Sequence, residues 1–356
     1  MRGSALEHAC HVEEVKMSHV RTMVSGYLFS VRKGASMLRS ATCSRLLYAL
    51  LLPLIGGAVQ AADLSSRYTD TSGDMVADAP TDESKWVDPA TLIFAYTPVE
   101  DPAVYAKVWD EFLQHMEQVT GKKVRFFPVQ SNAAQLEAMR AGRLHIAGFN
   151  TGSVPIAVNC AGFVPFTMMA DKQGDYGYQM EIITHTGSGI DDVAGLRGHT
   201  LAFTSPTSNS GFKAPSALLK SEFNLEADKD FKTAFSGKHD NSIMGVVNRD
   251  YDAAAIANSV LAQMKGRGMV KDDQYKVLYT SQTFPTTGYG YVYNLKPELA
   301  AKIREGFETF EWEGSALQAE FKNSEGEQFI PISYQEHWEV VRKIDQAMDV
   351  SYQCDK

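Results

Sequence analysis

A run of small hydroxyl and amide side chains separates an apolar segment from a helical one near the middle of the chain. The segment reads AFTSPTSNSGF at residues 202–212, and Ser208, Asn209 and Ser210 stand directly before Gly211. Residues of these types cap helices, so many strand-to-helix loops contain them. The free backbone N–H groups of a helix start, together with hydroxyls, also form an anion-binding site. Considered alone, this segment is compatible with either role.

Similar polar chemistry recurs in four other loops, three of which follow a predicted strand or precede a predicted helix. These loops contain Tyr96, Asn150 to Ser153, His239, and the stretch 280–290 with Tyr289. In open α/β sheets, ligands bind where the loops leave the carboxyl ends of the strands. Five polar loops at such positions favour one shared anion-binding cleft over five unrelated helix caps.

The elements that would position these loops alternate along the chain. Short apolar runs predict strands at 91–96, 123–129, 144–149, 178–184, 199–204 and 252–257. Apolar residues spaced three or four apart predict helices at 104–119, 133–141, 212–221 and 241–249. This alternation indicates an α/β fold with mainly parallel sheets. No repeat of 20–50 residues is evident, which disfavours solenoids and propellers.

The first 61 residues have the pattern of a secretory signal. Arg39 and Arg45 provide a basic region, residues 46–55 are apolar, and Val59 to Ala61 provide a cleavage site of small residues. The apolar stretch is short for a membrane span. We expect residues 1–61 to be a signal-peptide region whose true start is Met37, and the mature chain to be secreted.

The composition narrows the function classes. An apolar content of 44% among the 356 residues is enough for a hydrophobic core. The formal net charge of −9 argues against a general nucleic-acid binder. Residues 62–90 are polar and acidic, and we expect a flexible lead-in there. Cys160 and Cys354 either pair in an oxidising compartment, or remain a buried thiol and a free tail thiol. No CxxC or HExxH spacing supports a zinc site, and we expect no metal or cofactor.

Four segments, taken in order after the secretory signal, resemble the periplasmic substrate-binding proteins of phosphonate, phosphite and phosphate ABC importers. They are FAYTP, AGRLHIAGFNTGSV, FTSPTSNSGFKAPSALL and SGKHDNSIMGVVNRDYDAAAIANS. The similarity extends over residues 90–345. It implies a type II fold of two α/β lobes joined by a hinge, with residues 91–184 and 292–356 in lobe 1 and 185–291 in lobe 2.

The resemblance also implies a function and partners. It implies a receptor that captures a phosphorus oxyanion and delivers it to an ABC permease and ATPase complex in the inner membrane. It further implies a periplasmic, monomeric protein without enzymatic activity. The alternative is a secreted enzyme acting on a small phosphorylated or carboxylated substrate. The chain has no GxSxG motif and no paired acid and base, which favours the receptor.

Individual residues take roles from the same resemblance. Ser208, Asn209 and Ser210 correspond to the loop that grips the phosphonyl group, where the family has Ser-Thr-Ser, so Asn209 departs in type but still offers donors. His239 corresponds to a histidine that reaches the anion, and it would add a charge-assisted bond if the anion keeps it protonated. Tyr96 corresponds to an aromatic residue that closes over the ligand. The loop with Asn150, Thr151 and Ser153 corresponds to one that follows a strand of lobe 1.

One expected acid is missing. Family members that bind aminoalkylphosphonates use acidic residues to hold the ammonium group, and no acid occurs between Gln274 and Lys296. Asp252 is the remaining candidate for that role, and Tyr289 either lines the cleft or packs within a strand. We therefore expect a phosphorus oxyanion without an amine, with 2-aminoethylphosphonate as the alternative. The predicted ligand-binding residues are Tyr96, Asn150, Thr151, Ser153, Ser208, Asn209, Ser210, His239, Asp252 and Tyr289.

Overall fold

The structure is a computed structural model of the chain, and it describes residues 64–324, 326–352 and 354. All of these residues belong to one compact unit. The predicted signal peptide and the predicted start at Met37 lie outside the described residues. Within the described ranges, none of the helices combines the length and the apolar character needed to span a membrane.

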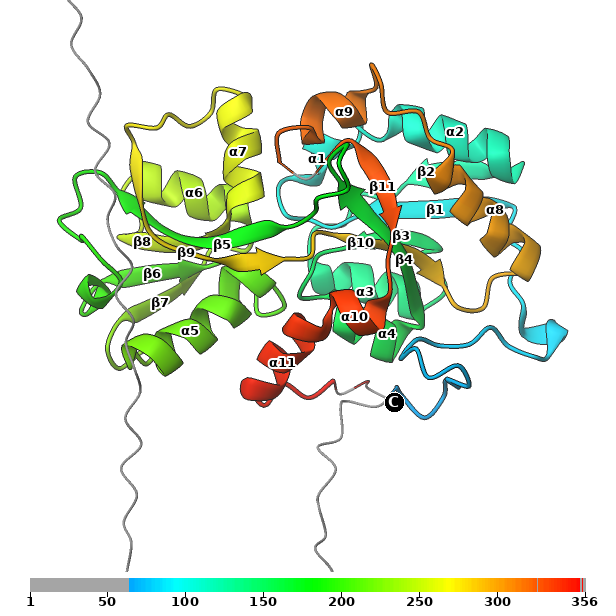
Figure 1. Cartoon of the computed structure of the whole chain (residues 1–356), viewed down its shortest axis with the longest axis horizontal. Coiled ribbons are helices and arrows are strands. Elements are labelled where there is room, and N and C mark those ends of the chain that lie inside the picture. Colours follow the sequence, from blue (N-terminus) through cyan, green and yellow to red (C-terminus); the bar gives the residue numbers. More distant parts are fainter. Residues whose placement is uncertain (1–63, 325, 353, 355–356) are drawn as a thin grey trace, which may run out of the picture. The chain divides into compact units, whose positions relative to one another are not determined.

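Two sheets organise the described part of the chain (Figure 1). The first has the strand order β11-β4-β10-β3-β1-β2 and the second the order β7-β6-β8-β5-β9. The strands of the first sheet are β1 (Thr91–Tyr96), β2 (Lys123–Phe126), β3 (Ile146–Phe149), β4 (Phe163–Ala170), β10 (Gly288–Val292) and β11 (Gln328–Pro331). Those of the second are β5 (Tyr178–His185), β6 (Thr200–Phe203), β7 (Lys232–Phe235), β8 (Ala253–Ala257) and β9 (Tyr275–Phe284).

Helices cover both faces of each sheet, and we call each sheet with its helices a lobe. The first lobe contains α1 (Pro102–Tyr105), α2 (Asp110–Thr120), α3 (Asn132–Arg140), α4 (Val154–Ala161), α8 (Pro297–Glu308), α9 (Ala316–Phe321) and α10 (Tyr334–His337). The second contains α5 (Ala214–Phe223) on one face of its sheet and α6 (His239–Val247) with α7 (Asn258–Gly266) on the other (Figure 1). The last helix, α11 (Glu339–Ala347), contacts the cores of both lobes.

Both sheets are mixed, which corrects the expectation of mainly parallel sheets. In the described part, β1 pairs in parallel with β2 and β3, and β6 with β7 and β8, whereas the remaining five pairings are antiparallel. The antiparallel strands include those that carry the chain between the sheets, from β4 to β5 and from β9 back to β10. A short apolar run has the same pattern in either direction, so the sequence could not reveal this.

The sheets also divide the chain differently from the expected lobe boundaries. Strand β5 belongs to the second sheet although the expected boundary at residue 184 placed it in lobe 1, and β10 belongs to the first sheet although residues up to 291 were placed in lobe 2. The chain therefore passes between the lobes at residues 171–177 and 285–287. The apolar pattern of β5 and β10 suits either core, because both strands are largely buried.

The segment expected to be a flexible lead-in packs on the first lobe. The backbone N–H of Val87 donates to Asn294 O at 2.8 Å, and Val76 and Ala77 are buried. Its acidic residues fix local turns, since the Asp70 carboxylate accepts the backbone N–H groups of residues 73–75. A composition typical of disorder therefore serves here to satisfy turn N–H groups.

A disulfide joins Cys160 on α4 to Cys354 near the C-terminus, 194 residues apart. Of the two alternatives that the sequence left open, the structure shows the paired one. The bond ties the C-terminal tail to the first lobe.

Candidate functional site

A cavity of about 30 Å³ lies where loops from both lobes meet. Its lining comes from loops that follow β1, β3, β6, β7, β8 and β9, with one residue from the start of β5. Most of these are the carboxyl ends of strands, where α/β sheets bind ligands. The described lining residues are Val99, Asn150, Thr151, Tyr178, Ser208, Asn209, Ser210, His239, Ala257, Ser259, Val260, Thr286 and Thr287.

The lining is polar but carries no Arg, Lys, Asp or Glu among the described residues. Hydroxyl, amide and imidazole groups predominate, and a hydroxyl can donate or accept a hydrogen bond. Space of this size accommodates about two buried waters. The arrangement therefore suits a small polar ligand that is held by several neutral hydrogen-bond donors.

The serine-rich loop both caps a helical turn and lines the cavity. The turn η3 (Asn209–Lys213) begins after Ser208, whose Oγ accepts the N–H of Gly211 at 3.0 Å. The first N–H groups of a helical turn have no acceptor within it, so those of Asn209 and Ser210 are available to a ligand. The loop therefore caps the turn and also presents backbone N–H groups to the cavity, so the two roles that the sequence left open are compatible.

His239 stands at the start of α6 as a neutral donor. Its Nδ1 accepts the N–H of Ala257 at 3.1 Å, and its own backbone N–H donates to Val99 O at 3.0 Å. Because a backbone N–H can only donate, the imidazole proton is on Nε2, which lies 3.5 Å from Ser208 Oγ. Burial lowers the pKa of His239 to about 4. The suggestion of a protonated, charge-assisted histidine is thus replaced by a neutral Nε2–H donor.

The first lobe contributes Asn150 and Thr151. Asn150 Oδ1 accepts the backbone N–H of Ser153 at 2.9 Å, which leaves the Asn150 side-chain NH₂ group as its donor toward the cavity. The Thr151 hydroxyl donates to Pro285 O at 2.7 Å. Thr151 therefore also holds the crossover that carries Thr286 and Thr287.

Four predicted residues do not line the cavity. Tyr96 and Tyr289 are buried and stack on each other with ring centroids 6.3 Å apart in the aromatic core of the first lobe. Ser153 begins α4 and is buried outside the lining. Asp252 accepts the Thr200 N–H at 2.8 Å and is half-exposed.

Asp252 is displaced for a topological reason. It precedes β8, whereas the cavity lies beyond the carboxyl end of that strand, so the acid is at the opposite edge of the sheet. Glu181, another acid of the second lobe, lies within β5 and is not in the lining either.

Sequence reasoning missed Val99, Tyr178, Ala257, Ser259, Val260, Thr286 and Thr287. Ser259 had a usable signal, because it is a polar residue just after a buried strand. Thr286 and Thr287 lay within a loop that was recognised, but Tyr289 was chosen from it. Tyr178 opens a strand and had no distinguishing pattern. Its hydroxyl accepts from Asn209 Nδ2 at 3.2 Å, a contact between residues 31 positions apart.

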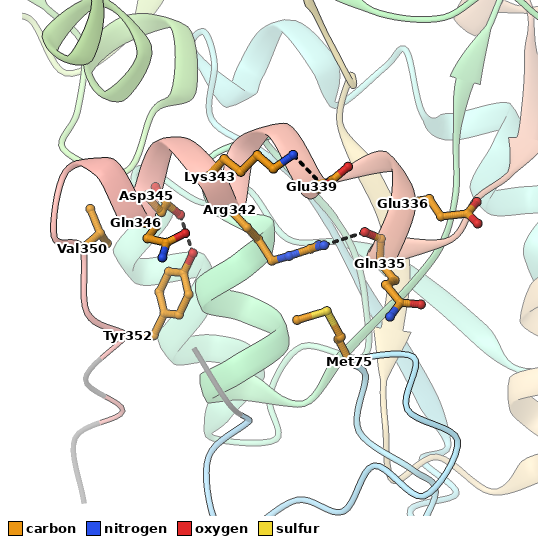
Figure 2. A pocket seen from close by; sticks show the side chains of 10 residues that line it. All are labelled: Met75, Gln335, Glu336, Glu339, Arg342, Lys343, Asp345, Gln346, Val350 and Tyr352. Atoms are coloured by element: carbon orange, nitrogen blue, oxygen red, sulfur yellow. Dashed lines mark hydrogen bonds and ion pairs between the residues drawn. The ribbon is translucent and has the colours of Figure 1, made fainter. Parts of the chain in front are cut away.

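A larger cavity of about 590 Å³ lies beside α11 (Figure 2). Most of its charged side chains are engaged with their neighbours: Lys343 Nζ lies 2.6 Å from Glu339 Oε1, and the Arg342 guanidinium donates to backbone carbonyls at 334 and 335. None of the polar loops reaches it. The smaller cavity between the lobes is therefore the candidate ligand site.

Comparisons with known proteins point to one family. A family described as "ABC transporter, phosphonate, periplasmic substrate-binding protein" matches residues 94–338. The phosphate-import protein PhnD of Mycolicibacterium smegmatis is 28% identical over 285 residues, which cover 75% of this chain and 86% of that protein.

Two solved structures share the fold. A binding protein component of an ABC phosphonate transporter from Pseudomonas aeruginosa is 21% identical, with a TM-score of 0.65 over 74% of this chain and 88% of that chain. PhnD1 from Prochlorococcus marinus, solved in complex with methylphosphonate, is 15% identical, with a TM-score of 0.65 over 74% of this chain and 100% of that chain. The two-lobe α/β architecture expected from the sequence is confirmed by these relatives.

Proposed function

The chain belongs to the periplasmic substrate-binding proteins of phosphonate ABC transporters, and from its cavity we propose that it captures a small phosphorus oxyanion without an amine group. Phosphate, phosphite and methylphosphonate have this chemistry. The relatives named above are a phosphate-import protein and a protein solved with methylphosphonate, which supports the proposal.

The neutral lining is the observation that carries the proposal. A tetrahedral oxyanion needs several donors around it, and helix-start N–H groups, hydroxyls and the His239 Nε2–H supply them without a buried cation. Donors come from both lobes, Asn150 from the first and Ser208 to Ser210 from the second. The ligand would therefore be enclosed between them by hinge closure.

The absence of a carboxylate from the described lining supports selectivity against an amine. An ammonium group taken out of water is costly unless a carboxylate pairs with it. Asp252, the candidate for that role, lies outside the lining, and so does Glu181.

Calorimetric titration with four ligands tests the proposal. We expect methylphosphonate, phosphite or phosphate to bind more tightly than 2-aminoethylphosphonate. Tighter binding of 2-aminoethylphosphonate would show that an acid reaches the ligand. Phosphorus NMR of the released ligand should find it chemically unchanged, as befits a receptor; conversion to a product would favour the enzyme.

Export, delivery and oligomeric state complete the proposal. We expect residues 1–61 to be removed on export, and the mature monomer to deliver its ligand to the permease of an ABC importer. The N-terminal sequence of the protein recovered from the periplasm tests the cleavage. Light scattering of the purified protein tests the monomer, and a dimer mass would contradict it.

A further inference from the structure

A buried lysine of the second lobe reaches the first lobe beside the cavity. Lys213 Nζ lies 2.8 Å from Gly152 O and 2.7 Å from Asp345 Oδ1. The side chains of Lys213 and Asp345 are only 5% and 2% exposed. Such a pair is stable when complete, whereas removal of one partner leaves an uncompensated buried charge.

The acid is held in place by the first lobe. Tyr352 donates its hydroxyl to Asp345 Oδ2, and Figure 2 shows the two side chains facing each other below α11. The tail that carries Tyr352 is bonded to α4 through Cys354 and Cys160. At the other end of α11, Trp338 Nε1 donates to Thr151 O at 2.9 Å. Asp345 is thus anchored to the first lobe through Tyr352 and Trp338, while its neighbour Ile344 packs against the second-lobe core.

Lys213 connects the two loops that line the cavity without lining it. It ends the turn η3, which begins with Asn209 and Ser210, and its acceptor Gly152 follows Thr151. The loops are in direct contact, since a Cβ added to Gly152 would lie 2.3 Å from Thr207 O. The lysine therefore fixes one ligand loop against the other.

We propose that Lys213 is a closure latch, a positioning residue whose bonds to Gly152 and Asp345 hold the lobes closed over the cavity and set how long a ligand stays bound. The proposal deepens the proposed function by adding its closing device, and it does not depend on which anion binds. Opening of the lobes would break the bond from Lys213 Nζ to Gly152 O, which joins the second lobe to the first. The latch consequently acts on the closed form.

A ligand-independent reporter of closure tests the latch. Lys238 Nζ donates to Gln130 Oε1 at 3.4 Å across the lobes on the surface. In the Gln130→Cys/Lys238→Cys protein, the rate at which a short bismaleimide cross-links the two cysteines, here called the trapping rate, measures how often the lobes close. Adding Lys213→Met or Asp345→Asn should lower that rate at least tenfold. Lys220→Met removes an exposed charge from α5 and should change nothing.

The same variants are then measured with methylphosphonate as the probe. Lys213→Met should raise the dissociation rate constant about a hundredfold and leave the association rate constant within about threefold. The Lys213→Met/Asp345→Leu protein, which replaces the pair by apolar groups, should recover much of the loss.

The outcomes separate the two proposals. A trapping rate in Lys213→Met within twofold of its parent would overturn the latch. So would a loss of ligand-binding free energy that is matched by an equal loss of unfolding free energy in the ligand-free protein. If none of the phosphorus anions binds the unaltered protein, the proposed ligand is wrong, while the trapping rates still decide the latch.

Discussion

Ser208 has a structural role that Ser210 lacks, so substitutions at the two positions distinguish effects on ligand binding from effects on stability. Both serines line the cavity, but only Ser208 Oγ also caps the turn, by accepting the Gly211 N–H. A lost hydrogen bond to an anion costs about 1.5–3 kcal/mol, or about one to two decades of affinity. We expect that loss in Ser208→Ala and Ser210→Ala, and an additional stability loss of about 1 kcal/mol only in Ser208→Ala. Calorimetric titration measures the affinity and thermal unfolding measures the stability. Unchanged affinity in both variants would show that this loop is not part of the ligand site.

His239 makes stability depend on pH in a defined window. Burial lowers its pKa from 6.5 to about 4 in the folded state. Between these values the unfolded state binds more protons, so this contribution is complete above pH 6.5 and is lost as the pH falls toward 4. The total is about 3 kcal/mol.

The difference between the unaltered protein and His239→Gln isolates this contribution. Urea unfolding at several pH values should show the unaltered protein losing stability relative to His239→Gln between pH 6.5 and 4. A pH-independent difference would mean that His239 is not buried as a neutral donor.

The residues found by sequence reasoning share one property. Asn150, Thr151, Ser208 to Ser210 and His239 follow strands whose carboxyl ends meet at the cavity, and polarity at such positions is visible in the sequence. Tyr96 and Tyr289 lie on strands, where the face a side chain occupies depends on packing that the sequence does not display. Hydrogen-bonding roles, such as the His239 tautomer, depend on neighbours distant in sequence.

At the level of the elements, the close packing of the turn η3 depends on a glycine. A Cβ added to Gly211 would lie 1.9 Å from Thr204 Oγ1 and 2.8 Å from Ser208 Oγ. Gly211→Ala should therefore destabilise the protein by about 1–3 kcal/mol and weaken ligand binding, because the turn must move.

Gly266, at the end of α7, is the matched control. An added Cβ there meets nothing within 4 Å, so Gly266→Ala should be neutral or slightly stabilising. Thermal unfolding of both variants decides; equal effects would mean that the turn tolerates a side chain.

The alternation of strands and helices was predictable, but strand direction and lobe membership were not. Apolar runs and spacing place β1, β2, β3, β5, β6 and β8 with α2, α3, α5 and α6, whereas most of the remaining described strands and helices were not predicted. Strands β3 and β8 are buried throughout, so they have no alternating pattern that reveals a partner. The direction of β5 and β10 follows from where the chain crosses between the lobes, which is a long-range property.

For the whole molecule, the disulfide is expected to stabilise the fold and the latch together. Cys160 and Cys354 close a loop of 194 residues, and such bonds are worth about 2–4 kcal/mol. Cys160→Ser/Cys354→Ser should lose stability of that order, measured by urea unfolding, and should also show faster ligand release because Tyr352 loses its anchor. A stability loss without faster ligand release would show that the C-terminal tail does not help to hold the lobes closed.

Closure itself can be prevented at one position, Gly152. A Cβ added there would lie 2.3 Å from Thr207 O and 2.5 Å from Asn209 N, both of which belong to the opposite lobe. Gly152→Val should therefore keep the lobes apart while each folds normally. In small-angle scattering, the unaltered mature protein with ligand should approach a radius of gyration of about 19 Å, the value for a compact chain of the roughly 295 residues that follow residue 61. Ligand should not compact Gly152→Val, and its affinity should be lost, because the donors of the two lobes no longer converge. Equal compaction of both proteins would show that the contact between the two loops does not limit closure.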